Sequence, residues 1–297
     1  MKLSRPLTSV LTFSLLALAA ALVAGCATFD ERQRAWIFQP SDRSWGGGLE
    51  AARNMDDVWI EFQSTVTGKA SKLHGLWLEA DMPLASLRDG LSNNDSPVLL
   101  YLHGARWNVT GSAFRMRRMQ ELGFSVLGVD YRGFGKSSAG LPSEDTAYED
   151  ARTAWDWLAA NYPNRPRYIF GHSLGGPIAI NLASQVTDES GTIVEGTFTS
   201  IADVVSTFKW GWVPISALIT QRFDAIRKVD QIGSPLLVVH GGRDQLIDPN
   251  LGRKLFEAAA EPKLFVLVEN GSHHNTNTVG QPQYKAALAQ LFKLDSR

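Results

Sequence analysis

The sequence predicts an α/β fold, in which a mostly parallel, twisted sheet carries helices on both faces. Strand-like apolar runs alternate with helix-like segments along most of the 297 residues, and this alternation is typical of parallel sheets. The run at 97–104 is apolar over most of its length, as expected of a strand buried on both faces. Residues with reactive side chains follow the ends of several runs, which is where ligands bind in open α/β sheets.

The expected elements follow one another in a regular order. Strands are predicted at 58–62, 73–78, 97–104, 124–129, 168–170, 192–199, 235–240 and 263–268. Helices are predicted at about 112–122, 144–161, 174–185, 250–260 and 282–292. The first two strands are expected to pair antiparallel, and Pro, Gly, Asn and Asp residues mark 81–96 as a polar surface loop. One α/β domain over 55–297, with a short cap at about 201–231, accommodates these elements.

The chain is nearly neutral. It carries 29 Lys and Arg residues against 30 Asp and Glu residues, a formal net charge of -1 at pH 7. A basic face for nucleic acid is therefore not expected. Cys26 is the one cysteine of the sequence, which excludes an intrachain disulfide and a metal cluster built from cysteines.

The first 25 residues are typical of a targeting segment. Lys2 and Arg5 supply a positively charged start, and the run at 10–23 is largely apolar. Small residues then precede Cys26, and this arrangement resembles a bacterial lipoprotein signal. The resemblance implies that residues 1–25 are a signal peptide and that Cys26 is lipidated as the first mature residue.

The same resemblance implies a membrane location. Acyl chains on Cys26 would hold the protein on a bilayer, and Ala27 after the cysteine favours the periplasmic face of the outer membrane in a bacterial cell envelope. The alternatives are a secretory peptide with an incidental cysteine and an uncleaved anchor, because a segment of about twenty residues could just span a bilayer. Residues 26–54 are predicted to be a tether that touches the domain through aromatic residues such as Trp36 and Phe38.

The strongest chemical signal lies at 171–175. An apolar run ends there in Gly-His-Ser-Leu-Gly, a G-x-S-x-G pentapeptide centred on Ser173, and a helix-like segment follows at once. A serine at the tip of such a turn is lifted off the sheet edge, and glycines on both sides avoid collisions with the backbone. Alone, the pattern is also compatible with a glycine-rich turn without chemistry. With suitable partners, Ser173 is a candidate nucleophile.

Two acidic residues follow the predicted strand at 235–240. Asp244 is preferred as the partner acid because it lies closer to the strand end. Asp248 directly precedes Pro249, an arrangement that suits a helix N-cap.

Two adjacent histidines follow the last predicted strand. His273 and His274 cannot both face Ser173, and His274 is preferred as the general base, which leaves His273 as a solvated loop residue. A metal site made of the two histidines and an aspartate is disfavoured because adjacent histidines diverge. No metal and no organic cofactor is expected.

The remaining candidates concern binding. Two backbone N–H groups are expected to form an oxyanion hole, one from Leu174 and one from Ala105, in the loop after His-Gly at 103–104. The large apolar residues of the cap are compatible with ordinary core or with the lining of an acyl pocket. Candidate substrate-binding residues are Arg106, Trp107, Phe208, Trp210 and Trp212.

Together these motifs resemble the α/β-hydrolase superfamily, in its branch of small abhydrolase-domain esterases and thioesterases. The matching segments keep the family order over about 55–295 and lie at 103–104, 130–138, 142–144, 171–175, 240–244 and 271–275. The resemblance implies the α/β-hydrolase fold, Ser173 as nucleophile, Asp244 as acid and a histidine base. The family histidine usually precedes an asparagine, as His274 precedes Asn275. The chain departs from the family at 105–107, where Ala-Arg-Trp replaces small residues, and at Asp248, near where a proline is usual.

The expected function is hydrolysis of a small carboxylic ester or thioester by a membrane-anchored serine hydrolase. Ser173 attacks the acyl carbonyl, His274 takes its proton, Asp244 orients the histidine, and water releases the acyl-enzyme. The short cap favours short or medium acyl chains over bulk triglyceride. Two alternatives stay open: a serine peptidase or amidase on the same fold, with Arg106 as an anchor for a peptide terminus, and a catalytically idle envelope scaffold.

Overall fold

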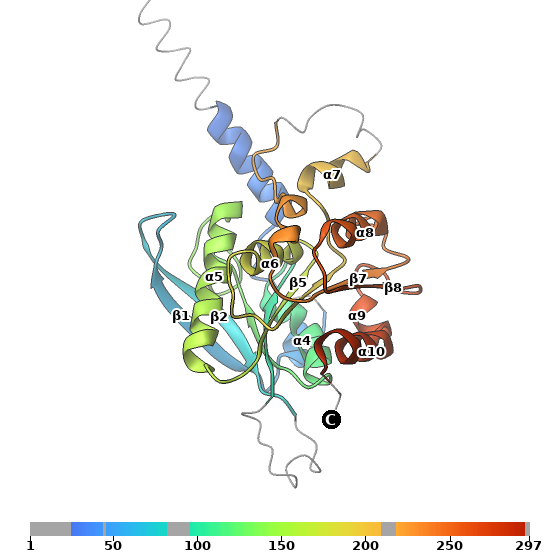
Figure 1. The fold of residues 1–297 in the computed structure, drawn as a ribbon. Coiled ribbons are helices and arrows are strands. Elements are labelled where there is room, and N and C mark those ends of the chain that lie inside the picture. The colour runs from blue at the N-terminus through green and yellow to red at the C-terminus, as the bar shows by residue number, and fades with distance from the viewer. Residues whose placement is uncertain (1–24, 44–45, 82–95, 209–217, 295–297) are drawn as a thin grey trace, which may run out of the picture.

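The computed structural model of the chain describes residues 25–43, 46–81, 96–208 and 218–294. They build one eight-stranded sheet with the order β1-β2-β4-β3-β5-β6-β7-β8 (Figure 1). The strands are β1 (Asp56–Gln63), β2 (Ala70–Leu78), β3 (Val98–Leu102), β4 (Ser125–Val129), β5 (Arg167–His172), β6 (Gly191–Glu195), β7 (Leu236–Gly241) and β8 (Lys263–Val268). β1 pairs antiparallel with β2, and β2 with β4, whereas every pair from β4 to β8 is parallel. The predicted α/β class is confirmed.

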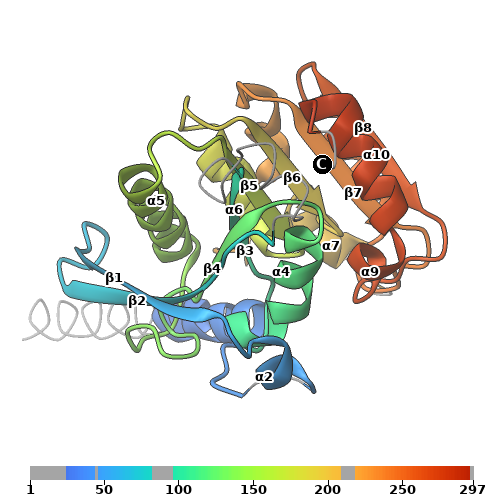
Figure 2. The ribbon, with the colours of Figure 1, turned by 90° about the horizontal axis from the view of Figure 1, so that it is seen from below.

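Helices cover both faces of this sheet (Figure 2). Alternate residues of each buried strand face opposite ways, so Leu100 belongs to one apolar core and Leu99 to the other. The first core includes α5 (Glu144–Asn161), α6 (Gly175–Ala183) and α8 (Pro249–Ala258), and the second includes α4 (Ala113–Gln120) and α10 (Gln281–Phe292). Shorter helical segments are α2 (Gly48–Ala51), η2 (Val109–Ser112), α7 (Ile201–Ser206), η4 (Ala225–Arg227), η5 (Val229–Gln231) and α9 (Thr276–Val279).

Local sequence explains where the longest of these helices begins. The Ser143 hydroxyl accepts a hydrogen bond from the backbone N–H of Thr146, and the Thr146 hydroxyl accepts one from the backbone N–H of Ser143, a capping box. Apolar residues then recur on one side of α5, including Ala151 and Trp155, and these side chains are buried. The helix predicted at 144–161 is confirmed residue for residue.

The N-terminal segment contacts the domain through Phe38, as predicted, and much of it is helical. Residues 25–38 form a helix, and Ile37 and Phe38 at its end are buried in the first core. The Phe38 ring lies edge-on against Phe134 and Phe223, with centroid distances of 6.3 and 5.7 Å. The chain therefore enters the domain much earlier than its polar composition suggests, because one face of a mostly polar helix is enough to dock it.

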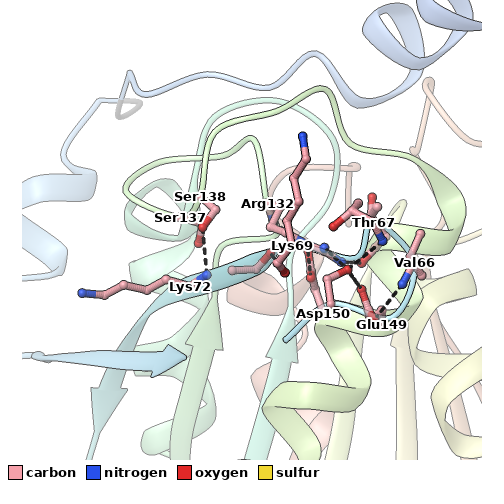
Figure 3. A network of polar contacts seen from close by, with 12 residues as sticks. Val66, Thr67, Lys69, Lys72, Arg132, Ser137, Ser138, Glu149 and Asp150 are labelled. Carbon is pink, nitrogen blue, oxygen red and sulfur yellow. Dashed lines mark hydrogen bonds and ion pairs between the residues drawn. The ribbon is translucent and has the colours of Figure 1, made fainter. Parts of the chain in front are cut away.

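The turn between β1 and β2 is held against α5 by a polar network (Figure 3). Glu149 accepts hydrogen bonds from the Ser64 hydroxyl and the Thr65 backbone N–H, both at 2.6 Å. Arg132 lies between Glu149 and Asp150, with N–O distances of 2.5 and 2.7 Å. Burial raises the pKa of Glu149, but these hydrogen bonds outweigh it and lower that pKa to about 2. The carboxylate that fixes the hairpin is therefore ionised over a wide pH range.

Replacing Phe38 tests whether the N-terminal helix belongs to the folded domain. Phe38→Ala should lower the free energy of unfolding by about 3–5 kcal/mol, because it removes a fully buried aromatic ring from the core. Trp36→Ala, two residues earlier at a side chain that is 56% exposed, should change it by less than about 1 kcal/mol. Urea unfolding followed by circular dichroism measures both. Equal, small effects would show that the helix does not contribute to the core.

Candidate active site

A cavity of about 580 Å³ opens where the parallel strands end, and Ser173 lies on its wall. Its lining comes from segments far apart in the sequence: the end of the N-terminal helix, the loop after β3, the turn after β5, α7 and the loops after β7 and β8. This is the position that open α/β sheets give to ligands, because the loops at the carboxyl ends of parallel strands converge there.

The turn that presents Ser173 is strained, as the pentapeptide predicts. Ser173 has φ of 54°, in the left-handed region that residues with a side chain rarely adopt. A Cβ on Gly171 would come within 2.3 Å of the Gly175 carbonyl oxygen, and a Cβ on Gly175 within 2.1 Å of the Leu102 carbonyl oxygen. Only glycine at these two positions lets β5 turn this sharply into α6.

Ser173, His273 and Asp244 form one hydrogen-bonded line. The distance from His273 Nε2 to Ser173 Oγ is 3.0 Å, and that from His273 Nδ1 to Asp244 Oδ2 is 2.8 Å. His273 and Asp244 are buried, while Ser173 keeps access to the cavity. The geometry is that of a nucleophile, a general base and an orienting acid.

The base predicted from the sequence was wrong: His273 takes this place, and His274 does not. The Ser272 backbone N–H donates to the side-chain oxygen of Asn275 at 2.7 Å, and this tight turn directs the two adjacent histidines differently. His273 points inward, whereas His274 is exposed at the edge of the same cavity. The asparagine that suggested His274 closes the turn, so it indicates the loop and not which histidine faces the serine.

Asp244 is held by its own loop. Its Oδ1 accepts hydrogen bonds from the backbone N–H groups of Leu246 and Ile247, each at 2.9 Å. Burial raises the pKa of Asp244, but hydrogen bonds from His240 and His273 outweigh that effect, and the net pKa lies below its ordinary value. Asp248 caps α8 instead, accepting from the backbone N–H of Asn250 at 2.9 Å. The preference for Asp244 over Asp248 matches the structure.

Sequence reasoning missed the group that holds the His273 loop in place. Arg115 is buried on α4, and its guanidinium donates to the carbonyl oxygens of His273 and His274 at 3.2 and 3.0 Å. Its Nε lies 3.4 Å from the carboxylate of Glu195. His172, inside the pentapeptide, also bonds through Nε2 to the His273 carbonyl oxygen at 3.1 Å. The available signal was the position of Arg115 among Ala113, Met116 and Met119, the buried residues of α4.

The loop after β3 is tied to the N-terminal helix. Arg106 and Trp107 have φ of 68° and 59°, two successive left-handed residues. The Arg106 backbone N–H donates to the Phe38 carbonyl oxygen at 2.8 Å, and its side chain donates to the Gln39 side-chain oxygen at 2.9 Å. These contacts hold the loop that carries Ala105, which lines the cavity together with Ser173.

The structure places some of the predicted binding residues at the cavity. Ala105, Leu174, Arg106, Trp107 and Phe208 all line the cavity. Trp210 and Trp212 lie outside the described residues, as do residues 1–24 of the predicted signal. Lining residues that the sequence did not indicate include Trp36, Val204, Val205 and Leu246.

Three further observations concern the described residues. Cys26 is exposed and lies in the helix at 25–38. In the parts of the chain that the structure describes, no group of three His, Cys, Asp or Glu side chains is placed to hold a metal ion. Within the same ranges, no helix has the length and apolar character needed to cross a bilayer.

Comparison with known proteins gives relatives over part of the chain. Residues 94–224 match the Hydrolase_4 family, described as serine aminopeptidase S33. An uncharacterized protein of Mycobacterium tuberculosis H37Rv is 33% identical over 186 residues, which cover 62% of this chain and 65% of that protein. The lysophosphatidylserine lipase ABHD12 of Danio rerio is 31% identical over 208 residues, 64% of this chain and 54% of that one. The chain thus spans less than two thirds of the length of these relatives.

Solved structures extend the likeness to most of the chain. The esterase Pf2001 of Pyrococcus furiosus aligns with a TM-score of 0.63 at 18% identity, over 87% of this chain and 98% of that one. The acylaminoacyl peptidase of Pyrococcus horikoshii aligns with a TM-score of 0.60 at 13% identity, over 84% of this chain and 44% of that one. At these identities the likeness is one of fold.

The assignment of the histidine predicts how the serine reacts. His273→Gln should slow labelling of Ser173 by a fluorophosphonate on the order of 10²- to 10⁴-fold, because it removes the base within reach of the hydroxyl. His274→Gln is the matched control and should label at close to the wild-type rate. The rates are measured by in-gel fluorescence at several times. The reverse ranking of the two variants would restore His274 as the base.

Buried neutral histidines predict loss of stability in acid. Burial lowers the pKa of His172 well below its ordinary value, and the charges of Arg115 and His273 lower it further. A depressed folded-state pKa gives stability that is present above the unfolded pKa, near 6.5, and is lost as pH falls below it. Between pH 7 and 5.5, His172→Gln should lose about 1 kcal/mol less unfolding free energy than wild type. Urea titrations at both pH values measure this, and parallel losses would contradict it.

Proposed function

From the premise that the chain has the α/β-hydrolase fold, we propose that it is a serine hydrolase of carboxylic esters or thioesters. The observation that carries the proposal is the hydrogen-bonded line from Asp244 through His273 to Ser173, which ends at the wall of a cavity. A relative named as lysophosphatidylserine lipase supports ester hydrolysis. The catalytic residues proposed are therefore Ser173, His273 and Asp244.

In this reaction His273 Nε2 takes the proton of the Ser173 hydroxyl as Oγ attacks the acyl carbon. The imidazolium that forms is stabilised by Asp244, which accepts a hydrogen bond from Nδ1 at 2.8 Å. The same proton then passes to the departing alkoxide or thiolate, which leaves as alcohol or thiol. A water molecule, activated by His273, releases the acyl group as a carboxylic acid.

The negative charge on the carbonyl oxygen needs donors already in place. Leu174 follows Ser173 and is the N-cap residue of α6, whose N-terminal end favours negative charge. Ala105 lies in the loop after β3, the strand next to β5 in the sheet. The Phe38 carbonyl oxygen holds this loop by accepting the backbone N–H of Arg106. We assign the oxyanion hole to the backbone N–H groups of these two residues, each worth on the order of 10²- to 10³-fold in rate.

The cavity walls favour an apolar acyl group. Five apolar residues from the loop after β6, from α7 and from just after α7 line one part of the cavity. They are Phe198, Ile201, Val204, Val205 and Phe208. An apolar wall next to a polar reaction centre is typical of a pocket for one hydrocarbon chain. We propose an ester or thioester of a single acyl chain as the substrate.

The location proposed is a bacterial cell envelope, with Cys26 lipidated and the domain on the periplasmic face of the outer membrane. The sequence of residues 1–26 supports this proposal. The exposure of Cys26 at the start of a helix is compatible with it. A peptidase or amidase activity is the second candidate, favoured by the family description of serine aminopeptidase and by Arg106 at the cavity.

Hydrolysis of p-nitrophenyl esters of increasing chain length tests the proposal. Ser173→Ala should lower kcat/KM on the order of 10³- to 10⁶-fold, because the nucleophile is lost while binding is kept. Ser184→Ala, a serine near the end of α6 that bonds to the Asn181 carbonyl oxygen, is the matched control and should stay near wild type. Labelling of Ser173 with turnover of aminoacyl amides but no ester would establish the peptidase alternative. No labelling and no turnover would leave an idle scaffold.

A further inference from the structure

We infer that the mouth of the cavity is a docking surface for a lipid bilayer. The inference rests on the proposed function and deepens it: the acyl ester is drawn from the same bilayer that carries the anchor at Cys26. Three features point to this surface: the apolar rim of the cavity, the helix that ends at this rim, and the apolar sequence that precedes the helix.

Four large apolar side chains form what we call the rim. Trp36, Trp107, Phe208 and Leu246 line the cavity and are also 56%, 36%, 45% and 48% exposed. A side chain that both borders a cavity and meets solvent lies at its opening. Single exposed apolar residues are ordinary, but four around one opening, from four separate segments, make an apolar patch of the kind that marks a contact surface.

The N-terminal helix connects this rim to the proposed anchor at Cys26, and hydrogen bonds hold the helix against the domain. Gln33 donates to the Leu218 carbonyl oxygen at 2.7 Å, and Arg34 donates to the Pro142 carbonyl oxygen at 2.8 Å. Phe38, four residues after Arg34, is buried. One face of the helix therefore contacts the domain along this stretch. Ten residues separate Cys26 from Trp36, a distance of about 15 Å along the helix.

The apolar sequence before the helix indicates that a bilayer is what contacts the rim. Residues 10–23 are largely apolar and end just before the helix begins. Whether that run is retained or replaced by acyl chains on Cys26, the bilayer surface comes within about 15 Å of Trp36. Figure 1 shows the N-terminal helix rising on the same side of the molecule as α7, which ends near Phe208. Tryptophan is a residue that favours the headgroup level of a membrane.

This placement explains why exposed apolar side chains surround the opening of the cavity. A lipid with one acyl chain can pass from the bilayer along Trp36 and Phe208 toward Ser173 without crossing water. Arg106, at the same cavity, is a suitable contact for an anionic headgroup at the interface. A soluble ester would need no such rim.

Depth-dependent quenching tests the docking. The full chain, reconstituted in phosphatidylethanolamine/phosphatidylglycerol vesicles, carries an environment-sensitive thiol label at Leu246→Cys. The matched control carries it at Asn164→Cys, an exposed residue before β5 and thus at the opposite edge of the sheet. Lipids spin-labelled near the headgroup should quench the label at 246 several-fold more than the label at 164. Phe208→Cys, on a separate segment of the rim, should repeat the result at 246.

Two other outcomes overturn the inference. Equal quenching at 246 and 164 would mean that the helix holds the mouth away from the bilayer. Label self-quenching at 246 that grows with the protein-to-lipid ratio would identify the rim as a contact with a second copy. All measurements are repeated with Ser173→Ala, so that docking is read independently of hydrolysis. Labelling of a chain without an introduced cysteine would show that Cys26 is unmodified, which refutes the proposed lipidation and not the docking.

Discussion

Glu195, at the end of β6, is the constraint on which the site geometry depends. Its backbone carbonyl oxygen accepts the N–H of Ser173 at 2.9 Å, which holds the strained turn. Its buried carboxylate lies 3.4 Å from Arg115 Nε and accepts the Tyr284 hydroxyl at 2.5 Å. A buried charge is tolerated only when it is paired and hydrogen-bonded. Arg115 in turn donates to the His273 carbonyl oxygen. Glu195 therefore holds the Ser173 turn through its backbone and the His273 loop through its ion pair with Arg115.

The N-terminal helix has a comparable role on the other side of the site. It contributes Phe38 to the core and a carbonyl oxygen to the loop that carries Ala105. Two successive left-handed residues in that loop are unfavourable by themselves and persist because the surrounding contacts determine them. The segment that leads from the proposed anchor is thus part of the cavity wall, and membrane attachment and substrate access are proposed to be coupled through it.

Much of the architecture could be predicted from local sequence. Three local features fixed their elements nearly to the residue. They are the capping box at Ser143, the buried run at 98–102 and the glycines around Ser173. The helix at 25–38 could not be placed this way. Its apolar face is narrow, and only the partners Phe134 and Phe223, far along the chain, show why it docks.

The sequence by itself determined the fold class, the serine on its sharp turn and the acid at the end of β7, because sterics and strand order act locally at those places. It did not determine which of two adjacent histidines faces the serine. That depends on the turn closed by Asn275 and on Arg115, brought from α4 to the His273 loop across a separation of 158 residues. The choice between His273 and His274 was therefore made by packing between distant segments, which a local pattern cannot contain.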